Sequence, residues 1–327
     1  MLLVWIVLLV LGLAASIAAS GRALGAAEAL RLRAGIPPHI VGLTIVSVGT
    51  DLPEIANSIV ASAAGRGDLN VGDSTGSAAT QITLVLGVLC LLRPLVADRR
   101  LVASAGLLTV AAFALAAWMM ADLTLSRLDG AVLVLGWVGS TALVYRVTAS
   151  AGRQLPGAEP PAAEPPARAP AGDGGAGGGG QGIPSLVVRT LVALGVVAVG
   201  AVLAVEAFAE ATELLGVPDY ATSFLVLSLG TSLPELLVDS RAVMTGMGAL
   251  ALGDVLGSSL IDATLSLGIG PLLFPTAVSA GTARATLLVG GVVLATVLLL
   301  LSRRTHARGT GIAAIVLYLV LFPIVIA

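Results

Sequence analysis

The sequence predicts an all-α membrane protein in which ten transmembrane helices form two inverted five-helix repeats. Three observations support this prediction. The composition is strongly apolar, hydrophobic runs of membrane-spanning length occur in two sets of five, and residues 47–87 of the first set recur as residues 228–268 of the second.

Composition establishes the membrane class. Of the 327 residues, 57% are hydrophobic and only 11% are charged, whereas a soluble domain carries about 25% charged residues. The formal net charge of −2 gives no basis for a nucleic-acid partner, and the single cysteine, Cys90, excludes an intrachain disulfide. We therefore expect an integral protein of the plasma (inner) membrane that has the lipid bilayer as a partner.

Runs long enough to cross a bilayer, about 20 residues, define the ten spans. The first five lie at 1–20, 38–64, 70–92, 101–121 and 128–147, and the second five at 185–208, 219–245, 250–274, 283–301 and 310–327. Residues 149–183 are rich in Ala, Pro and Gly, which predicts a disordered cytoplasmic linker. It separates a first half, 1–148, from a second half, 184–327. We expect the run at 1–20 to remain as an uncleaved span, because no positive charge precedes it.

The distribution of arginine gives an orientation. The chain contains no lysine, so its 17 basic residues are all arginines. With each loop numbered by the span it follows, 14 arginines lie in or beside odd loops, and only Arg66, Arg127 and Arg284 lie in even ones. Because basic residues collect on the cytoplasmic side of a membrane, we expect cytoplasmic odd loops and both termini in the extracellular or periplasmic space.

The internal repeat relates the two halves. Residues 47–87 align with 228–268 at a constant offset of 181 without a gap, and 18 of the 41 positions are identical. The first copy reads SVGTDLPE, VGDSTGS and TLVLG, and the second reads SLGTSLPE, LGDVLGS and TLSLG. Five spans separate matched points, so the copies must cross the membrane in opposite directions. Inverted repeats of this kind are typical of secondary transporters, with the substrate site between the repeats.

Carboxylates within the predicted spans indicate where cations bind. Glu54 and Glu235 occupy matched positions, and Asp262 is a third acid in an apolar stretch. A carboxylate inside a membrane costs several kcal/mol unless it has a partner. No arginine lies near either glutamate in the repeated motif. A bound cation is the simplest remaining partner, although a protonated glutamate hydrogen-bonded between helices is the structural alternative.

Other oxygen atoms accompany these carboxylates. Each glutamate follows a threonine by four residues, so both side chains share a helix face. Each also follows a proline, which has no N–H and leaves the carbonyl four residues earlier unpaired. An all-oxygen set suits Ca²⁺ or Na⁺. In the next span of each half, two further candidates are four residues apart: Ser77 and Gln81 in the first half, and Ser258 and Asp262 in the second. The full set of these additional candidates is Thr50, Thr231, Gly49, Gly230, Ser77, Gln81, Ser258 and Asp262.

At these motifs the chain resembles the sodium/calcium exchangers of the calcium/cation antiporter superfamily. GTDLPE with GDSTGSAATQ, and GTSLPE with GDVLGSSLID, are similar to the two alpha repeats of that family. The resemblance implies antiport of Ca²⁺ and Na⁺ by alternating access, without a cofactor or catalysis, by a chain that we expect to work as a monomer. It implies Glu54 and Glu235 as principal calcium ligands, with the other oxygen-bearing residues completing the sites. It also implies that spans 1 and 6 slide as a gating pair.

Departures from the family pattern keep one alternative open. Asp51 occupies a position that is usually serine or threonine, as Ser232 still is in the second repeat, and Gln81 replaces an asparagine. If Asp51 faces the site, we expect it and Ser232 to join the ligand set. Clustered carboxylates oppose one another's ionisation, so protons could participate in coupling. A proton-coupled exchanger of calcium or another divalent cation is therefore the nearest alternative function.

Further polar residues have open roles. Asp73 and Asp254 replace the family's usual asparagine, and either line the ion path or cap helix starts. We expect Asn57 to form packing hydrogen bonds, and Asp239 to be a solvated charge at the end of span 7. A cation channel fits the two-fold repeat less well than a transporter does. An intramembrane protease would need a HExxH helix, a Ser–His pair or a paired-aspartate motif; no HExxH occurs, and neither histidine lies mid-span.

Overall fold

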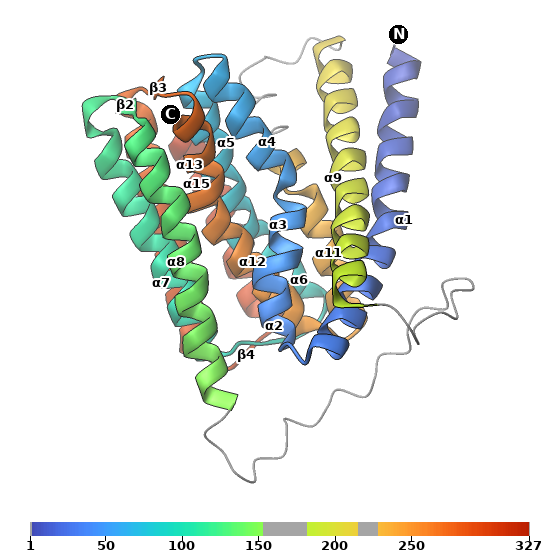
Figure 1. The fold of residues 1–327 in the computed structure, drawn as a ribbon. Helices are drawn as coiled ribbons and strands as arrows, with labels where there is room; N and C mark the ends of the chain where they lie inside the picture. Colours follow the sequence, from blue (N-terminus) through green and yellow to red (C-terminus); the bar gives the residue numbers. More distant parts are fainter. Residues whose placement is uncertain (1, 153–181, 215–227, 327) are drawn as a thin grey trace.

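The computed structural model describes residues 2–152, 182–214 and 228–326, and these residues form a bundle of helices (Figure 1). The predicted linker lies almost wholly outside the described residues, as does the predicted start of span 7 at 219–227. The elements of the first half are α1 (Leu2–Ala34), α2 (Pro38–Val41), η1 (Gly42–Val46), α3 (Ser47–Thr50), α4 (Leu52–Ala63), α5 (Gly67–Ala79), η2 (Thr80–Val85), α6 (Leu86–Leu92), β1 (Leu95–Val96), α7 (Arg99–Met119), η3 (Met120–Asp122), β2 (Thr124–Leu125) and α8 (Arg127–Gly152). Those of the second half are α9 (Ile183–Leu214), a helical turn at 228–231, α11 (Leu233–Met244), α12 (Gly248–Ile261), η4 (Asp262–Ser266), α13 (Leu267–Leu273), β3 (Thr276–Ala277), α14 (Ala280–Ser302), β4 (Thr305–His306) and α15 (Arg308–Ile326).

Within the described residues, five helical stretches are long and apolar enough to cross a membrane. They lie at 67–92, 99–122, 127–148, 248–273 and 280–302. Two of them, 67–92 and 248–273, are 78% and 83% buried inside the protein over their most apolar part, whereas 127–148 is only 17% buried. The third span of each half therefore lies in the centre of the bundle, and the outer helices present apolar side chains to the lipid.

The internal repeat extends over the whole described chain. The offset of 181 residues that relates the two motifs also relates the starts of α1 and α9, α4 and α11, α5 and α12, α7 and α14, and α8 and α15. Two glycines with left-handed backbone, Gly65 (φ +70°) and Gly246 (φ +87°), turn the chain at matched points before α5 and α12. Only glycine adopts such a conformation without strain, so the duplication preserved this turn in both halves.

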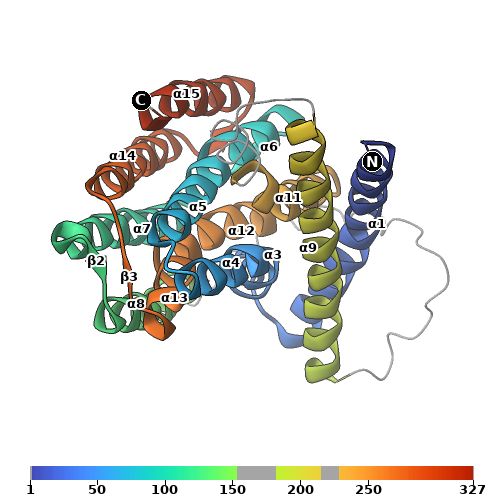
Figure 2. The same cartoon turned by 90° about the horizontal axis from the view of Figure 1, so that it is seen from above.

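The two halves run in opposite directions where they can be compared most easily. In Figure 1, α1 descends from the N-terminus and α9 ascends from its first residues beside it. Figure 2 shows α1 and α9 together at one edge of the bundle, and the two helices pack along much of their length. This antiparallel pair fits the inverted repeat expected from the sequence.

The predicted end of the first span needs correction. The first span does not end at residue 20, because α1 continues to Ala34, with Ala23, Leu24 and Leu30 buried. The segment is rich in alanine and leucine, which are strong helix formers, so Arg22, Arg31 and Arg33 lie on a helix and not in a loop. Two short strand pairs accompany the helices: β1 pairs with β4 and β2 with β3, each as a two-residue antiparallel ladder between the halves.

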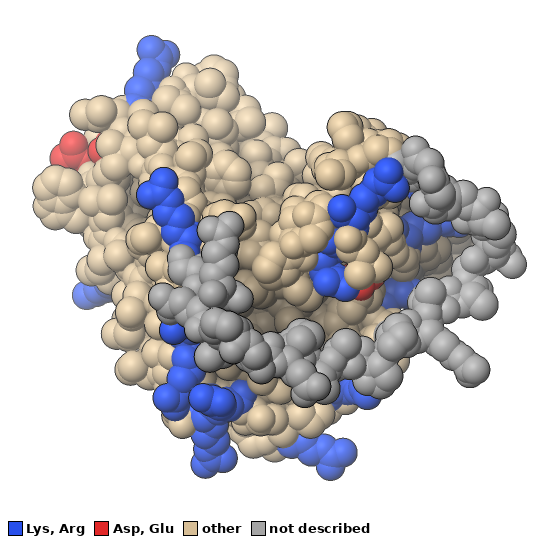
Figure 3. All heavy atoms as spheres, turned by 60° about the horizontal axis from the view of Figure 1, so that its bottom comes forward, with Lys and Arg blue, Asp and Glu red and all other residues tan. Residues whose placement is uncertain are grey.

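The strand pairs place the loops at two ends of the bundle. The β1–β4 pair joins the connection before α7 to that after α14, and the arginines at this end include Arg99, Arg100, Arg303 and Arg304, all exposed. Figure 3 shows arginines spread over the lower face of Figure 1, with few acidic residues among them. The β2–β3 pair joins the connections at 123–126 and 274–279. This segregation agrees with the odd and even loops lying at opposite ends.

Candidate cation-binding site

The site forms where one helix in each half is interrupted. Asp51 (φ −79°, ψ 8°) separates α3 from α4, and Ser232 (φ −83°, ψ 6°) precedes α11. A proline follows each break by two residues, Pro53 and Pro234, and cannot donate the N–H that would continue the helix. Irregular backbone is tolerated inside a membrane where it is buried in protein or lines a cavity. The breaks thus bring main-chain and side-chain oxygens to the interior.

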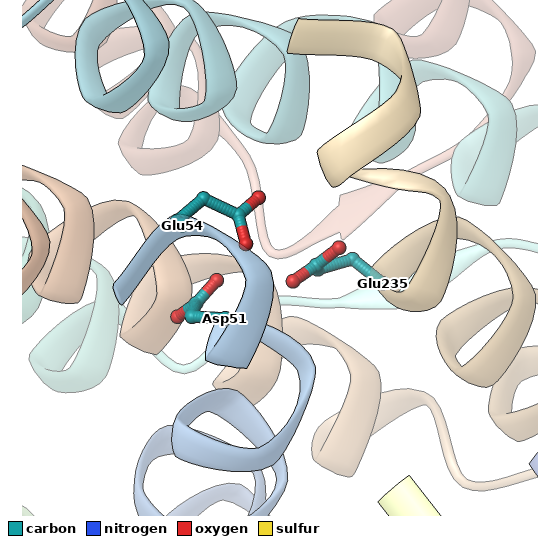
Figure 4. A group of neighbouring side chains, drawn as sticks. All are labelled: Asp51, Glu54 and Glu235. Atoms are coloured by element: carbon teal, nitrogen blue, oxygen red, sulfur yellow. The ribbon is translucent and has the colours of Figure 1, made fainter. Parts of the chain in front are cut away.

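Three carboxylates converge at these breaks. Asp51, Glu54 and Glu235 each offer one oxygen, and these atoms lie within 4.8 Å of one another. All three side chains are completely buried. Figure 4 shows Asp51 and Glu54 on one interrupted helix, facing Glu235 from the other half. Both copies of the repeat therefore place carboxylates in one cluster, which brings the matched pair Glu54 and Glu235 together.

Most carboxylate oxygens of this cluster lack a donor among the described residues. Both oxygens of Glu54, both of Glu235 and Oδ2 of Asp51 accept no well-formed hydrogen bond from the described residues. Unpaired buried charges cost several kcal/mol each. The cluster is therefore suited to a cation that is coordinated by carboxylate oxygen, which is the preference of Ca²⁺ and other hard cations.

Asp262 and Gln81 occupy matched positions beside the cluster. Asp262 is completely buried, and its charge acts on Asp51 and Glu54. Gln81 donates from Nε2 to Asp51 Oδ1 at 3.3 Å. Both residues lie in π-helical segments, η2 and η4, and a third such segment, η1, precedes α3. Single π-helical turns inside helices occur frequently at functional sites.

Hydroxyl groups surround the carboxylates with mixed roles. Ser77 Oγ and Thr231 Oγ1 lie 2.9 Å apart and so link the two halves, whereas Thr50 Oγ1 donates to Val46 O at 3.1 Å. The hydroxyls of Ser232 and Ser258 are buried without a hydrogen-bond partner among the described residues. The structure thus leaves two serine oxygens available and commits other hydroxyls to protein contacts.

Gly49 serves packing as well as its predicted carbonyl role. A methyl group added at Gly49 would lie 2.4 Å from Cδ1 of Leu194 on α9. Only glycine allows this approach between the interrupted helix and α9. Gly230 is buried in the helical turn at 228–231, and the carbonyls of both glycines remain predicted ligands.

The acidic residues Asp73 and Asp254 do not cap helices. Asp73 is the seventh residue of α5 and Asp254 the seventh of α12, so the capping interpretation is wrong. Asn57 Nδ2 donates to Asp73 Oδ2 at 2.6 Å, and Thr231 Oγ1 donates to Asp73 Oδ1 at 3.4 Å. The interpretation of Asn57 as a hydrogen-bonding residue is confirmed.

The interpretation of Asp239 as a solvated charge is wrong, because its side chain is completely buried. Its neighbour Arg241 points elsewhere: its guanidinium packs beside Gly21 on α1. The sequence held a usable signal, since Asp239 follows Glu235 by four residues and so lies on the same face of α11. The proximity of an arginine to the predicted span end obscured it.

Comparison with known proteins identifies the family. Residues 4–146 and 185–327 match the family model described as sodium/calcium exchanger protein. These two segments are the two halves of the chain, and together they cover well over half of it.

The chain belongs to the sodium/calcium exchanger protein family. This exchanger is 28% identical over 282 residues to the putative antiporter CaxA of Alkalimonas amylolytica, covering 86% of this chain and 85% of the relative. It is 28% identical over 306 residues to the sodium/calcium exchanger MaX1 of Methanosarcina acetivorans, covering 85% and 86%. A solved structure of the sodium-calcium exchanger NCX_Mj matches it with a TM-score of 0.76, 23% identity and 99% coverage of both chains, which shows a common fold.

Membership settles the general class of this exchanger. It is an integral membrane transporter of inorganic cations, not a member of a catalytic family. The protease alternative raised by the sequence is thereby removed.

Proposed function

We propose that this exchanger moves Ca²⁺ in exchange for Na⁺ by alternating access, through one central site formed by Asp51, Glu54, Glu235 and Asp262. The observation that carries the proposal is the convergence of the buried carboxylates of Asp51, Glu54 and Glu235 within 4.8 Å. Neither glutamate has a hydrogen-bond donor among the described residues. Thr50, Thr231, Ser77, Gln81, Ser232 and Ser258, with the carbonyls of Gly49 and Gly230, complete the oxygen set.

The proposal includes ten spans, with both termini outside. Beyond the five long apolar stretches, the remaining spans would be α1, the interrupted helices α2–α4 and 228–244, α9 and α15. The segregation of arginines at one end of the bundle supports a cytoplasmic assignment for that end. Residues 149–183 would connect the halves there.

Charge explains why exchange is favoured over simple leak. An empty site would leave unpaired carboxylates in a low dielectric, and this opposes movement of the gating helices until a cation binds. The gating pair would be α1 and α9. Leu194 of α9 touches the interrupted helix at Gly49, so sliding of α9 would directly change the environment of the site.

A specific observation keeps a second function in view. Asp51 lies in the cluster and adds a fourth carboxylate to Glu54, Glu235 and Asp262. One calcium ion neutralises only two of these four charges. Protons on the remainder would make the protein a proton-coupled exchanger on the same fold.

The test is ⁴⁵Ca²⁺ uptake into proteoliposomes that contain the purified exchanger. An outward Na⁺ gradient and an outward H⁺ gradient are imposed in separate samples, with ionophore-collapsed gradients as controls. Uptake driven by Na⁺ alone is the expected result. Uptake driven by H⁺ alone would replace the proposal with proton coupling, and uptake with neither would contradict calcium exchange.

A further inference from the structure

A second pair of buried acids lies outside the central cluster, on α11 and α12. Asp239 and Asp254 are both completely buried, and their carboxyl groups approach each other closely. None of their four oxygens accepts a hydrogen bond from a donor among the described residues. Two ionised carboxylates repel each other and can only accept hydrogen bonds. Positive charge must therefore lie between them, either as a proton through which one acid hydrogen-bonds to the other or as a bound cation.

The pair is aligned with the central cluster. Asp239 follows Glu235 by one turn of α11. Asp254 precedes Ser258 by one turn of α12 and Asp262, the first residue of η4, by two turns. One turn of four residues advances about 6 Å along a helix. Asp254, Ser258 and Asp262 therefore place donor-free oxygens at successive turns, from the α11–α12 connection to the centre.

At the matched position in the first half, the polar side chains accept hydrogen bonds from protein donors. There Asp73, the counterpart of Asp254, accepts from Asn57 and Thr231. Ser58, the counterpart of Asp239, accepts from the backbone N–H of Gly270 at 3.1 Å. The first half thus carries one acid with hydrogen-bond donors at this position, whereas the second half carries two acids without them.

We propose that Asp239 and Asp254 form a second binding site for a hard cation, Na⁺ or Ca²⁺, between the central cluster and the α11–α12 connection. Two carboxylates supply up to four oxygens, and water completes the shell, as hard cations accept. Its position makes it a staging site through which cations reach or leave the centre. This transport role depends on the proposed function, but the binding itself does not.

The site is tested in a variant whose central cluster is disabled. The full chain carrying E54Q/E235Q is purified in detergent micelles. Its equilibrium binding of ⁴⁵Ca²⁺ and, separately, of ²²Na⁺ is then measured. We expect one bound cation per chain, and adding D239N should weaken its binding at least tenfold. The matched control is D73N in the same background, which removes a buried acid that already has donors and should leave binding unchanged.

The isotope that binds identifies the ion at this site. Binding of ⁴⁵Ca²⁺ assigns calcium, and binding of ²²Na⁺ alone assigns sodium. The site is refuted if E54Q/E235Q binds neither ion, or if both D239N and D254N leave binding unaltered. D239N places an amide beside Asp254, just as Asn57 lies beside Asp73, so this variant should fold, and its size-exclusion profile verifies this. Failure of the wild-type chain to transport calcium would overturn the proposed function and leave this binding result readable.

Discussion

The two halves of the molecule share a framework but distribute their acids differently. In the first half an acid, Asp51, occupies the helix break and an amide, Gln81, the following helix, where the two side chains hydrogen-bond. In the second half a serine, Ser232, occupies the break and an acid, Asp262, the following helix. Each half thus offers two carboxylates to the centre, with only the glutamates at matched positions.

The same contrast appears one turn farther from the centre. Asp73 is held by Asn57 and Thr231, whereas its counterpart Asp254 faces Asp239 without a donor. Duplication preserved the turns, the helix bounds and the close contacts, because these maintain the fold. The number of buried acidic side chains could diverge between the halves, because each such substitution changes the partner that the buried side chain must bind. Variants at matched and unmatched positions should therefore differ in their effects.

The largest effect should come from the glutamates that both halves share. E54Q or E235Q removes a charge while keeping the shape of the side chain, and we expect calcium transport to fall at least about 100-fold, more than is typical for residues that merely support a metal ligand. Uptake into proteoliposomes measures this. E28Q, which alters a glutamate paired with Arg31 on α1, should transport normally. Substantial transport by either site variant would remove that residue from the site.

Replacing Gly76 of α5 or Gly257 of α12 by alanine should destabilise the fold by different amounts. These glycines precede the matched serines Ser77 and Ser258. A methyl group at Gly257 would lie 2.7 Å from Cα and O of Leu43 and 2.9 Å from Ser47 Oγ, whereas at Gly76 it would meet Ser228 Cβ at 2.9 Å. Because backbone cannot yield easily, we expect G257A to destabilise by about 2–3 kcal/mol and G76A by less. Denaturation in micelles compares them, and the reverse ranking would contradict the packing described.

The amide that satisfies Asp73 should contribute to stability. N57V copies Val238 from the second half and leaves a buried acid with one donor fewer, which should cost about 2 kcal/mol. D73N should relieve part of that loss, so the double variant N57V/D73N should be more stable than the sum of the single effects requires. Strict additivity of the two changes would show that this hydrogen bond does not stabilise the fold.

The smallest of the four effects should follow from making the breaks alike. D51S gives the first half the serine of the second, and we expect a roughly tenfold weaker apparent affinity for calcium, about 1.4 kcal/mol, with transport retained. D122S, at an aspartate that bonds only Thr124 among the described residues, is the matched control. An unchanged affinity in D51S would mean that Asp51 is not a ligand.

Much of the fold and the centre of the site could be predicted because hydropathy and the repeat encode them directly. The offset of 181 residues is enough to pair Glu54 with Glu235, and the prolines locate the breaks. The extension of α1 was missed because arginines interrupt its apolar pattern while leaving helix propensity high.

Other features depend on packing that sequence does not display. The π-helical turns at Gln81 and Asp262 contain residues that an ordinary helix would accept, so their sequence carries no distinct signal. Asp239 is buried because α12 covers α11 near their connection, whereas hydropathy alone placed it at a solvated span end. Its partner Asp254 was noticed as a departure, but their proximity required the fold.

The most direct measurement is anomalous diffraction from crystals of this protein soaked in Sr²⁺, used as a heavier substitute for Ca²⁺. We predict a peak coordinated by oxygens of Asp51, Glu54 and Glu235, which disappears in crystals of E54Q/E235Q. A Sr²⁺ peak elsewhere in the membrane-embedded region, with none among these carboxylates, would contradict a central site at this cluster.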